Sequence, residues 1–309
     1  MTLHDSRIVV TGAAGRVGFP IARDLAAPAL GNTVFGVGRM SGPGDVATLR
    51  SAGIEPLRRD LGDGADFTDL PDAKYVFHAA TALGPAAAAD WKYAFEVNAQ
   101  ASGRLVERYA GCQGFVYCST GSAYQYQGAR PLREDDPPGI HIGNYSLSKI
   151  AGEAVVTFAS RRFGTPVTII RIFSTYGPMG GAPADRLDRI LRGEPIPMHP
   201  DTPNRYNPIY EDDYVHLGVR ALEVAACPPV VVNWSGSETV SLEEYCTYLG
   251  ELVGRPAQLV ISDRAYWPLW PDTTRMHELL GRTRVGWRDG FRRMVAARHP
   301  ELPLIDPEP

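Results

Sequence analysis

The chain of 309 residues is long enough to bury a substantial core, in one large domain or two smaller ones. Its formal net charge of −4 leaves no basic stripe that would grip a phosphate backbone, so no nucleic-acid partner is expected. No apolar run approaches the ~20 residues that cross a bilayer, and no membrane role is expected either. Small molecules are the expected partners.

The cysteines and the chain start bear on the compartment. The four cysteines form no C-x-x-C pair and show no metal-ligand spacing, which predicts no metal site. Residues 1–12, MTLHDSRIVVTG, contain no basic and then apolar leader. We therefore expect a cytoplasmic protein with reduced thiols.

Short apolar runs rich in β-branched residues recur along the first half of the chain and read as buried strands. They are RIVV (7–10), TVFGV (33–37), KYVFHA (74–79), GFVYCS (114–119) and VTIIRI (167–172). Stretches with helical periodicity lie between them, at 18–30, 91–111 and 144–164. This alternation predicts an α/β fold, a Rossmann-type doubly wound parallel sheet covered on both faces.

The composition and the pattern of the sequence change after about residue 175. Prolines crowd residues 177–210, and helical patterns resume at 212–226, 241–254 and 273–281. We expect residues 1–175 to bind a dinucleotide and residues 176–309 to form a smaller, mostly helical substrate lobe. The two parts are expected to interleave, with some strands returning to the main sheet.

A glycine-rich turn, TGAAGRVG (11–18), follows the first strand and spaces Gly12, Gly15 and Gly18 by three. Such a turn needs glycine because a side chain would keep a pyrophosphate away from the helix N-terminus. Ordinary turns also use glycine, but the position between the first strand and a helix favours dinucleotide binding.

The end of the second predicted strand bears on the choice between NAD and NADP. NAD sites usually place an acidic group there, whereas this chain has Gly38 followed by Arg39. A guanidinium suits a 2′-phosphate, so the sequence favours NADP(H); the alternative is a solvated arginine, and NAD also binds without the acid. Asp60, at a third strand end, is either an adenine contact or an exposed turn residue.

Tyr145 and Lys149 lie four residues apart at the start of the helical pattern 144–164. Residues i and i+4 share a helix face, so the ammonium can approach both the phenol and a cofactor ribose. A neighbouring cation stabilises the phenolate of a residue whose reference pKa is about 10. The pair indicates a tyrosine acid/base, with an ordinary surface pair as the alternative.

Several motifs, in the same order, resemble those of the extended short-chain dehydrogenase/reductase superfamily, the NAD-dependent epimerase/dehydratase family. They are TGAAGRVG (11–18), HAAT (78–81), VNAQASGRLVE (97–107), VYCSTGSAY (116–124), YSLSK (145–149), RIFSTYGP (171–178) and NPIYEDDYV (207–215). The resemblance covers almost the entire chain, and several motifs in order are more specific than any one of them. It implies an NAD(P)-dependent enzyme.

The resemblance also implies roles for particular residues. Tyr145 is the catalytic acid/base, Lys149 tunes it and binds the nicotinamide ribose, and Thr120 hydrogen-bonds the reacting oxygen. The neighbouring hydroxyls of Ser119 and Ser122 are alternatives to Thr120 for this role, and a helix or turn cap is the alternative role for Thr120. Asn98 is expected to order a water or the backbone of the active site; a buried Asn with no catalytic part is the alternative. The expected cofactor contacts come from Gly12, Gly15, Arg16, Val17, Gly18, Arg39, Asp60, Leu61, Ala79, Ala80, Thr81, Tyr145, Lys149 and Ile172.

Three further positions bear on the substrate. Dehydratases of the family carry Asp-Glu directly after the catalytic Thr, where this chain has Gly121 and Ser122, so dehydration is disfavoured. Epimerases carry Asn in an R-x-F-N segment, where this chain has Ser174. Arg205 has the position of the epimerases' phosphate-binding arginine, or else pairs with a nearby carboxylate. We expect Ser122, Ser174 and Arg205 to contact the substrate.

Aromatic residues concentrate in AYWPLWPD (265–272), at Tyr266, Trp267 and Trp270. Such side chains line sugar or base pockets, and they also fill the cores of small lobes. The sequence alone favours core packing.

These observations leave two enzyme hypotheses and one of another class. The first is epimerase-like hydride transfer at a secondary alcohol or ketone of a sugar or sugar nucleotide. The second is an NADPH-dependent carbonyl reductase or dehydrogenase of a non-nucleotide substrate, which Arg39 and Ser174 favour. The third is a non-catalytic dinucleotide sensor, against which retention of Tyr145, Lys149 and Thr120 argues. The resemblance also implies a homodimer through the helices at 91–111 and 144–163.

Overall fold

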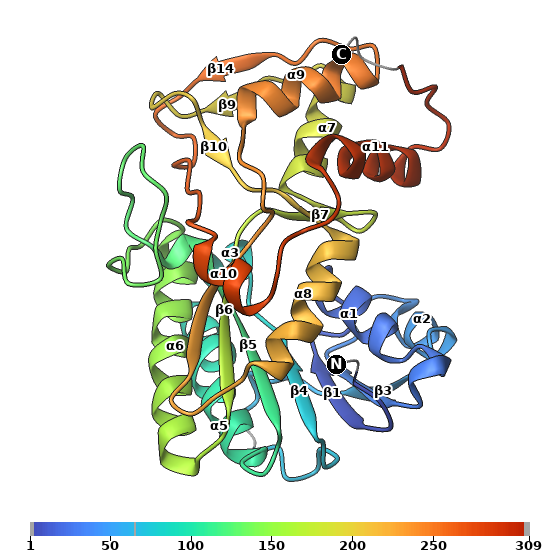
Figure 1. The fold of residues 1–309 in the computed structure, drawn as a ribbon, viewed down its shortest axis with the longest axis vertical. Coiled ribbons are helices and arrows are strands. Elements are labelled where there is room, and N and C mark those ends of the chain that lie inside the picture. The colour runs from blue at the N-terminus through green and yellow to red at the C-terminus, as the bar shows by residue number, and fades with distance from the viewer. Residues whose placement is uncertain (1–2, 65, 306–309) are drawn as a thin grey trace. The chain divides into compact units, whose positions relative to one another are not determined.

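The computed structural model describes residues 3–64 and 66–305, and the chain forms two compact units (Figure 1). The first unit contains the chain up to Ala123, Pro137–Arg171 and Val215–Val232. The second unit contains Tyr124–Asp136, Ile172–Tyr214 and the chain from Asn233 onward. Each unit is therefore assembled from segments that lie far apart in the sequence.

A seven-stranded sheet has the order β12-β6-β5-β4-β1-β2-β3 (Figure 1). In chain order its strands are β1 (Arg7–Thr11), β2 (Thr33–Gly38), β3 (Ile54–Arg58), β4 (Tyr75–His78), β5 (Gly114–Thr120), β6 (Val167–Ile172) and β12 (Val230–Trp234). The pairs β1 with β2, β1 with β4, β2 with β3 and β4 with β5 are parallel. This order confirms the predicted Rossmann-type doubly wound fold.

Helices cover both faces of the sheet, because successive side chains of a strand point to opposite faces. Side chains of β1, β4 and β5 share one buried cluster with those of α5 (Ala101–Arg108) and α6 (Gly143–Phe163). On the opposite face, Gly218 of α8 (Glu211–Glu223) approaches Phe77 so closely that an added Cβ would lie 3.3 Å from the ring. Parallel strands buried on both sides explain the nearly continuous apolar runs in the sequence.

One predicted helix ends early. The periodicity at 18–30 predicts a single helix, but α1 spans Gly18–Leu25 and a 3₁₀ turn follows at Pro28–Leu30. Proline disfavours helical backbone at the residue before it, and Ala27 has an extended ψ of 128°.

A second predicted helix is divided into three parts. The pattern at 91–111 becomes α4 (Trp91–Phe95), a π-helical turn (Glu96–Gln100) and α5. The π-helical turn frees backbone groups from the regular α-helical ladder, and such turns are frequent at functional sites.

The described residues of the second unit form short strands and helices. Its small sheets pair β7 (Thr175–Gly177) with β8 (Gly180–Gly181) and β11 (Ile209–Tyr210), β10 (Arg205–Tyr206) with β13 (Val240–Ser241), and β9 (Ile196–Met198) with β14 (Leu259–Ile261). Its helices are α7 (Ala182–Arg192), α9 (Leu242–Leu252), α10 (Thr274–Leu279) and α11 (Trp287–Arg298). Side chains of α7, α9 and α11 share one buried cluster. This confirms the predicted helical character of the C-terminal part.

Three observations bear on membrane spanning, metal binding and the state of the cysteines. Among the residues that the structure describes, no helix is both long enough and apolar enough to cross a membrane. The same residues contain no group of three or more His, Cys, Asp or Glu arranged to hold a metal ion. All four cysteines are free thiols.

Candidate active site

The glycine turn after β1 is too tight for side chains. Gly12 has a φ of +67°, and a Cβ there would lie 2.7 Å from the Ala80 backbone nitrogen. A Cβ on Gly18 would lie 2.3 Å from the Gly12 carbonyl oxygen. The Gly12 amide donates to the Val37 carbonyl over 2.8 Å, which fixes the turn against β2. Glycine is thus required at positions 12 and 18 by packing, and the turn opens α1 as phosphate-binding turns do.

A cavity of about 320 Å³ lies above this turn, within the first unit. Its walls come from the turn and from the carboxyl ends of β2, β3 and β4, the edge at which doubly wound sheets bind ligands. The walls include eleven of the residues predicted for the cofactor: Gly12, Gly15, Arg16, Val17, Gly18, Arg39, Asp60, Leu61, Ala79, Ala80 and Thr81. The structure therefore brings together most of the predicted cofactor residues in one cavity.

Tyr93 joins Arg39 and Asp60 in this cavity and was not identified from the sequence. Its hydroxyl donates to Asp60 Oδ1 over 2.9 Å, and its ring centre lies 5.8 Å from the Arg39 guanidinium carbon. Burial, followed by the hydrogen bond to Asp60, raises the pKa of Tyr93 above its usual value. Asp60 also accepts from the Gly62 amide, so it is a fixed acceptor beside the Arg39 cation.

Tyr145 and Lys149 lie one turn apart on α6, and the lysine is 1% exposed. The Lys149 Nζ lies 4.2 Å from the centre of the Tyr117 ring and has no hydrogen-bond partner among the described residues. Burial lowers the pKa of Lys149 to about 8. A buried ammonium that lacks an acceptor fits the hydroxyls of a cofactor ribose.

Burial and a neighbouring hydroxyl have opposite effects on the pKa of the Tyr145 phenol. Burial raises its pKa above 10.0, and a hydrogen bond with Thr120 acts in the opposite direction. Thr120, at the end of β5, is 8% exposed, and its Oγ1 lies 3.0 Å from the Ser122 hydroxyl. Ser146 in turn donates to the Ser122 carbonyl over 2.8 Å, which fixes this segment to α6. The structure thus brings Tyr145, Thr120 and Ser122 together.

Asn98 lies in the π-helical turn and is completely buried. Its Oδ1 accepts from the Thr81 hydroxyl and the Ala82 amide, and its Nδ2 donates to the Ala82 carbonyl and the Ser148 hydroxyl. Both donors and both lone pairs of the amide are engaged. Asn98 therefore ties the segment after β4 to α6.

His78 connects the turn to the same region. Its Nδ1 lies 2.6 Å from the Thr11 hydroxyl and its Nε2 lies 2.9 Å from the Ser102 hydroxyl. Burial, followed by the Lys149 charge, lowers the pKa of His78 to about 3. The imidazole is neutral at pH 7 and joins β1, β4 and α5 by uncharged hydrogen bonds.

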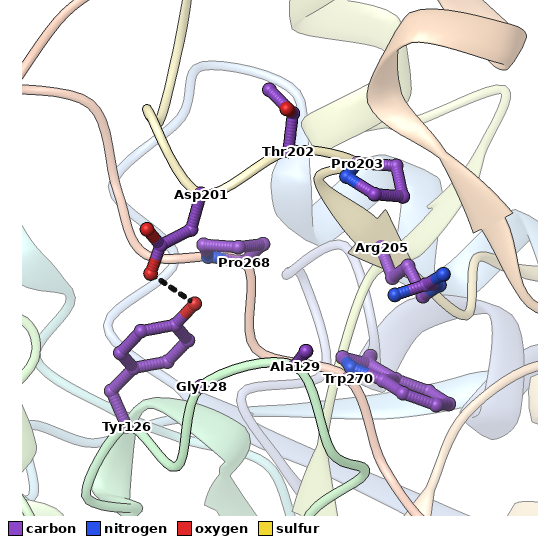
Figure 2. A pocket seen from close by; sticks show the side chains of 9 residues that line it. All are labelled: Tyr126, Gly128, Ala129, Asp201, Thr202, Pro203, Arg205, Pro268 and Trp270. Atoms are coloured by element: carbon purple, nitrogen blue, oxygen red, sulfur yellow. Dashed lines mark hydrogen bonds between the residues drawn. The ribbon is translucent and has the colours of Figure 1, made fainter.

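Two of the predicted substrate residues belong to the second unit. Ser174 accepts a backbone hydrogen bond from the Ile209 amide over 2.9 Å. Arg205, on β10, has its guanidinium carbon 5.7 Å from the Trp270 ring centre in a cavity shown in Figure 2. Ile172, predicted to contact the cofactor, ends β6 and belongs to the second unit.

The fold and the turn define a dinucleotide-binding α/β protein, with a Tyr–Lys pair one helical turn apart. The profile of the NAD dependent epimerase/dehydratase family matches residues 8–233, and the chain belongs to that family. This confirms the resemblance inferred from the motifs and makes the protein an enzyme of the NAD(P)-dependent class.

Curated relatives match most of the chain, and a solved structure shares its fold. The chain is 28% identical to an uncharacterized UDP-glucose epimerase, YtcB, of Bacillus subtilis over 303 residues, or 89% of this chain and 92% of the relative. It is 27% identical to a probable UDP-glucuronate 4-epimerase of Rhizobium meliloti, over 81% of this chain and 83% of the relative. A crystal structure of UDP-glucuronic acid 4-epimerase from Bacillus cereus, in complex with UDP-glucuronic acid and NAD, superposes with a TM-score of 0.82 at 23% identity, covering 96% and 99% of the two chains. At that identity the superposition shows the shared fold.

Proposed function

We propose that the protein transfers a hydride at a secondary alcohol or ketone carbon of a sugar nucleotide, as an epimerase does. The relatives support this assignment, since the two named above carry the names of an uncharacterized UDP-glucose epimerase and a probable UDP-glucuronate 4-epimerase. The observation that carries the chemical part is the buried Lys149 ammonium, which lies one turn from Tyr145 and has no hydrogen-bond partner among the described residues. A buried cation without hydrogen-bond acceptors is costly to keep unless a ligand supplies them.

The side chains of this protein would move the proton of the substrate hydroxyl. A bound nicotinamide cofactor would supply the hydride chemistry, since it can accept a hydride from the substrate carbon and return it to the opposite face of the resulting ketone. Tyr145, as phenolate, accepts the hydroxyl proton while the C–H bond breaks, and it donates that proton back on reduction. Lys149 stabilises the phenolate and binds the cofactor ribose, and Thr120 hydrogen-bonds the reacting oxygen.

The cofactor is held by the first unit. The turn at 12–18 presents backbone amides and the N-terminus of α1 to the pyrophosphate. Arg39 and Asp60 are assigned to the adenosine end of the cofactor, and Ser41 lines the same cavity as Arg39. A guanidinium with an adjacent hydroxyl favours the 2′-phosphate of NADP, and we propose NADP(H) as the preferred cofactor. Solved relatives contain NAD, which is the competing choice.

We assign the binding roles according to the two predicted parts of the chain. Residues 1–175 are assigned to the dinucleotide and residues 176–309 to the substrate, with interleaved strands. Within the second part, Ser174 and Arg205 are assigned to the substrate, together with Ser122 from the first.

A second candidate function is an NADPH-dependent carbonyl reductase or dehydrogenase of a non-nucleotide substrate. Ser174 favours it, because this residue departs from the Asn of the resembled epimerases. Dehydration stays disfavoured, since Gly121 and Ser122 offer neither a carboxylic acid nor a carboxylate base.

One experiment tests the epimerase assignment. The purified protein is incubated with UDP-glucose or UDP-glucuronic acid, without added cofactor, and the products are separated by chromatography. Formation of the 4-epimer by cofactor retained through purification supports the proposal. Stoichiometric NADPH consumption with simple ketones, and no epimer, supports the reductase instead.

We also propose a homodimer through the helices of the first unit. Leu147 and Phe158 on α6 are 49% and 69% exposed, and Trp91 and Phe95 on α4 are 60% and 38% exposed. Large apolar side chains gathered on neighbouring helices favour burial against a second copy. In sedimentation velocity we expect a dimer for the wild type and a monomer for Phe158→Glu.

The free cysteines are consistent with the proposed cytoplasmic location.

A further inference from the structure

Thr81, in the segment that follows β4, contacts both the proposed catalytic tyrosine and the buried Asn98. Its hydroxyl donates to Asn98 Oδ1 over 2.9 Å, and it also hydrogen-bonds the Tyr145 phenol. Thr81 lines the cofactor cavity as well. A cofactor contact alone does not account for the two hydrogen bonds, so the Thr81 hydroxyl has a further role to explain.

Asn98 fixes the backbone directly beside the Thr81 hydroxyl. Its Oδ1 accepts from the Ala82 amide over 2.8 Å, and its Nδ2 donates to the Ala82 carbonyl over 3.1 Å. The same Nδ2 donates to the Ser148 hydroxyl over 2.9 Å, and that hydroxyl donates to the Tyr145 carbonyl over 2.9 Å. One buried side chain therefore connects the segment of Thr81 with the backbone of Tyr145, which holds the two hydroxyls in register.

Apolar packing holds the Tyr145 ring against the same segment. The ring packs on a buried cluster that contains Ala82, the residue after Thr81, together with Ala87, Ala94 and Val97. All of these residues belong to the first unit. The phenol and the Thr81 hydroxyl thus share one rigid support.

Thr120 is the other hydroxyl partner of the phenol, and the proposed reaction gives it a second task. Its Oγ1 accepts from the Ser122 amide over 3.1 Å and lies 3.0 Å from the Ser122 hydroxyl. During turnover Thr120 is assigned to the substrate oxygen. A hydroxyl carries a single proton, so Thr120 cannot donate to the substrate oxygen and to the phenolate at the same time.

The Thr81 hydroxyl suits both protonation states of the phenol. With the neutral phenol, Thr81 Oγ1 accepts from Tyr145 while its own proton goes to Asn98. With the phenolate, the Thr81 hydroxyl turns its proton to Tyr145, and Asn98 Oδ1 keeps the Ala82 amide as a donor. The rotation leaves no buried group without a partner, so it carries no large desolvation cost.

We infer, on the basis of the hydride-transfer function proposed above, that Thr81 is a positioning residue for the acid/base. Its hydroxyl donates to the Tyr145 phenolate while Thr120 hydrogen-bonds the substrate oxygen, and Asn98 takes the Thr81 proton back when the phenol is neutral. Thr81 acts on the reaction through Tyr145 and not through the substrate.

The ionisable groups around the phenol leave this role to a neutral donor. Lys149 on α6 and Arg16 in the glycine turn are the cations that act on it. Cys118 and Tyr117 of β5, and Tyr93 of α4, are neutral at pH 7 because burial raises the pKa of each. A substitution that removes only the Thr81 hydroxyl leaves all of these charges as they are.

Titration of the Tyr145 phenol by NMR tests the inference directly. The full chain is labelled with 13C at the tyrosine Cζ, saturated with NADP⁺ and, in a parallel series, with NAD⁺, and Tyr145→Phe identifies the signal. Thr81→Val keeps the size and removes the hydroxyl, and we expect the pKa of Tyr145 to rise by about one unit, as for a lost hydrogen bond to a charged group. Thr81→Ser keeps the hydroxyl and should stay within about 0.3 unit of the wild type.

Thr168→Val is the matched control. Thr168 is fully buried on β6 and donates to the Ala221 carbonyl over 2.8 Å, so this variant loses a buried hydroxyl outside the site. We expect it to leave the pKa of Tyr145 unchanged. If Thr81→Val does not fold, Thr81→Ala removes the same hydroxyl with less bulk and carries the same expectation.

The pH profile of kcat supplies a second readout. The acidic limb should move up by the same unit in Thr81→Val, so kcat falls roughly tenfold below the limb and recovers above it. A merely structural defect would lower kcat equally at every pH.

The outcomes separate this inference from the proposed function, because turnover of UDP-glucose and UDP-glucuronic acid is measured on the same samples. If the wild type turns these over and Thr81→Val titrates as Thr168→Val does, the inference is overturned and the proposed function stands. An equal shift in Thr81→Ser and Thr81→Val also overturns it, since the hydroxyl is then irrelevant. A shift in Thr81→Val alone, without turnover of either substrate by the wild type, supports the inference and overturns the sugar-nucleotide function. A wild-type phenol that stays protonated to about pH 11 overturns the inference whatever the turnover.

Discussion

The Lys149 ammonium lies 4.2 Å from the centre of the Tyr117 ring, and the lysine is 1% exposed. The ring face supplies partial negative charge to a cation that has no hydrogen-bond acceptor in the described part of the chain. The Tyr117 hydroxyl donates to the Asn98 carbonyl over 2.8 Å. The Tyr117 ring therefore contacts the Lys149 ammonium, and its hydroxyl binds the Asn98 backbone. Substitutions can remove one of these interactions without the other.

Tyr117→Leu removes the ring face, and we expect the pKa of Lys149 to fall below its value of about 8. A desolvated cation–π contact contributes about 2 kcal/mol, which corresponds to a shift of roughly one pKa unit after partial compensation. The apparent alkaline pKa in the pH profile of kcat/KM reports the shift. Tyr117→Phe keeps the ring and serves as the control; an equal shift in that variant would assign the effect to the hydroxyl.

Gly12→Ala is expected to abolish cofactor binding while leaving the fold intact. The added Cβ would lie 2.7 Å from the Ala80 nitrogen at a φ of +67°, so the turn must move. Gly164→Ala is the control, because Gly164 has a φ of +72° and nothing within 4 Å of the added Cβ. Both variants lose about 1 kcal/mol to backbone strain, but only Gly12→Ala should weaken cofactor affinity, by more than tenfold in fluorescence titration. Similar affinities in the two variants would contradict the account of the turn.

Much of the first unit was predictable from the sequence, for a physical reason. Strands buried on both faces leave apolar runs, and a phosphate-binding turn requires glycine, so β1, the turn and the strand–helix alternation leave a direct signal. The i, i+4 spacing likewise placed Tyr145 and Lys149 on one face of α6.

Contacts across the sheet could not be predicted in the same way. Tyr117 and Tyr93 come from other elements, and no local spacing connects them with Lys149 or Asp60. The π-helical turn that buries Asn98 has no periodic signature, and the helix pattern at 91–111 conceals it. The segments of the second unit that meet at Arg205 and Trp270 lie far apart in the chain, so the aromatic segment alone favoured core packing.

The free energy of unfolding should change with pH because the pKa of His78 differs between the folded and unfolded chain. Its pKa is about 3 in the folded protein and 6.5 in the reference state, so the unfolded chain binds more protons between these values. The stability that neutral His78 contributes is present above pH 6.5 and is lost as the pH falls toward 3, at up to about 1.4 kcal/mol per unit. Urea unfolding of His78→Asn should show a shallower loss over this range than the wild type, and parallel curves would refute the assignment.

Arg39→Ala tests the proposed NADP preference. Losing the guanidinium should weaken NADPH binding about tenfold more than NADH binding, since only NADPH carries a 2′-phosphate. Arg161→Ala, at an exposed position of α6, is the control. Equal losses for the two cofactors would reject the preference and leave NAD as the physiological choice.

The most direct measurement is turnover of UDP-glucose or UDP-glucuronic acid by Tyr145→Phe, with cofactor affinity determined on the same sample. The account predicts that kcat falls by about a thousandfold or more, because no other phenol replaces the acid/base, while the cofactor dissociation constant stays within about threefold of the wild type. Tyr248→Phe is the control for replacing a phenol outside the site. Turnover of Tyr145→Phe within tenfold of the wild type, with cofactor bound, would contradict the assignment of Tyr145 as the group that moves the proton.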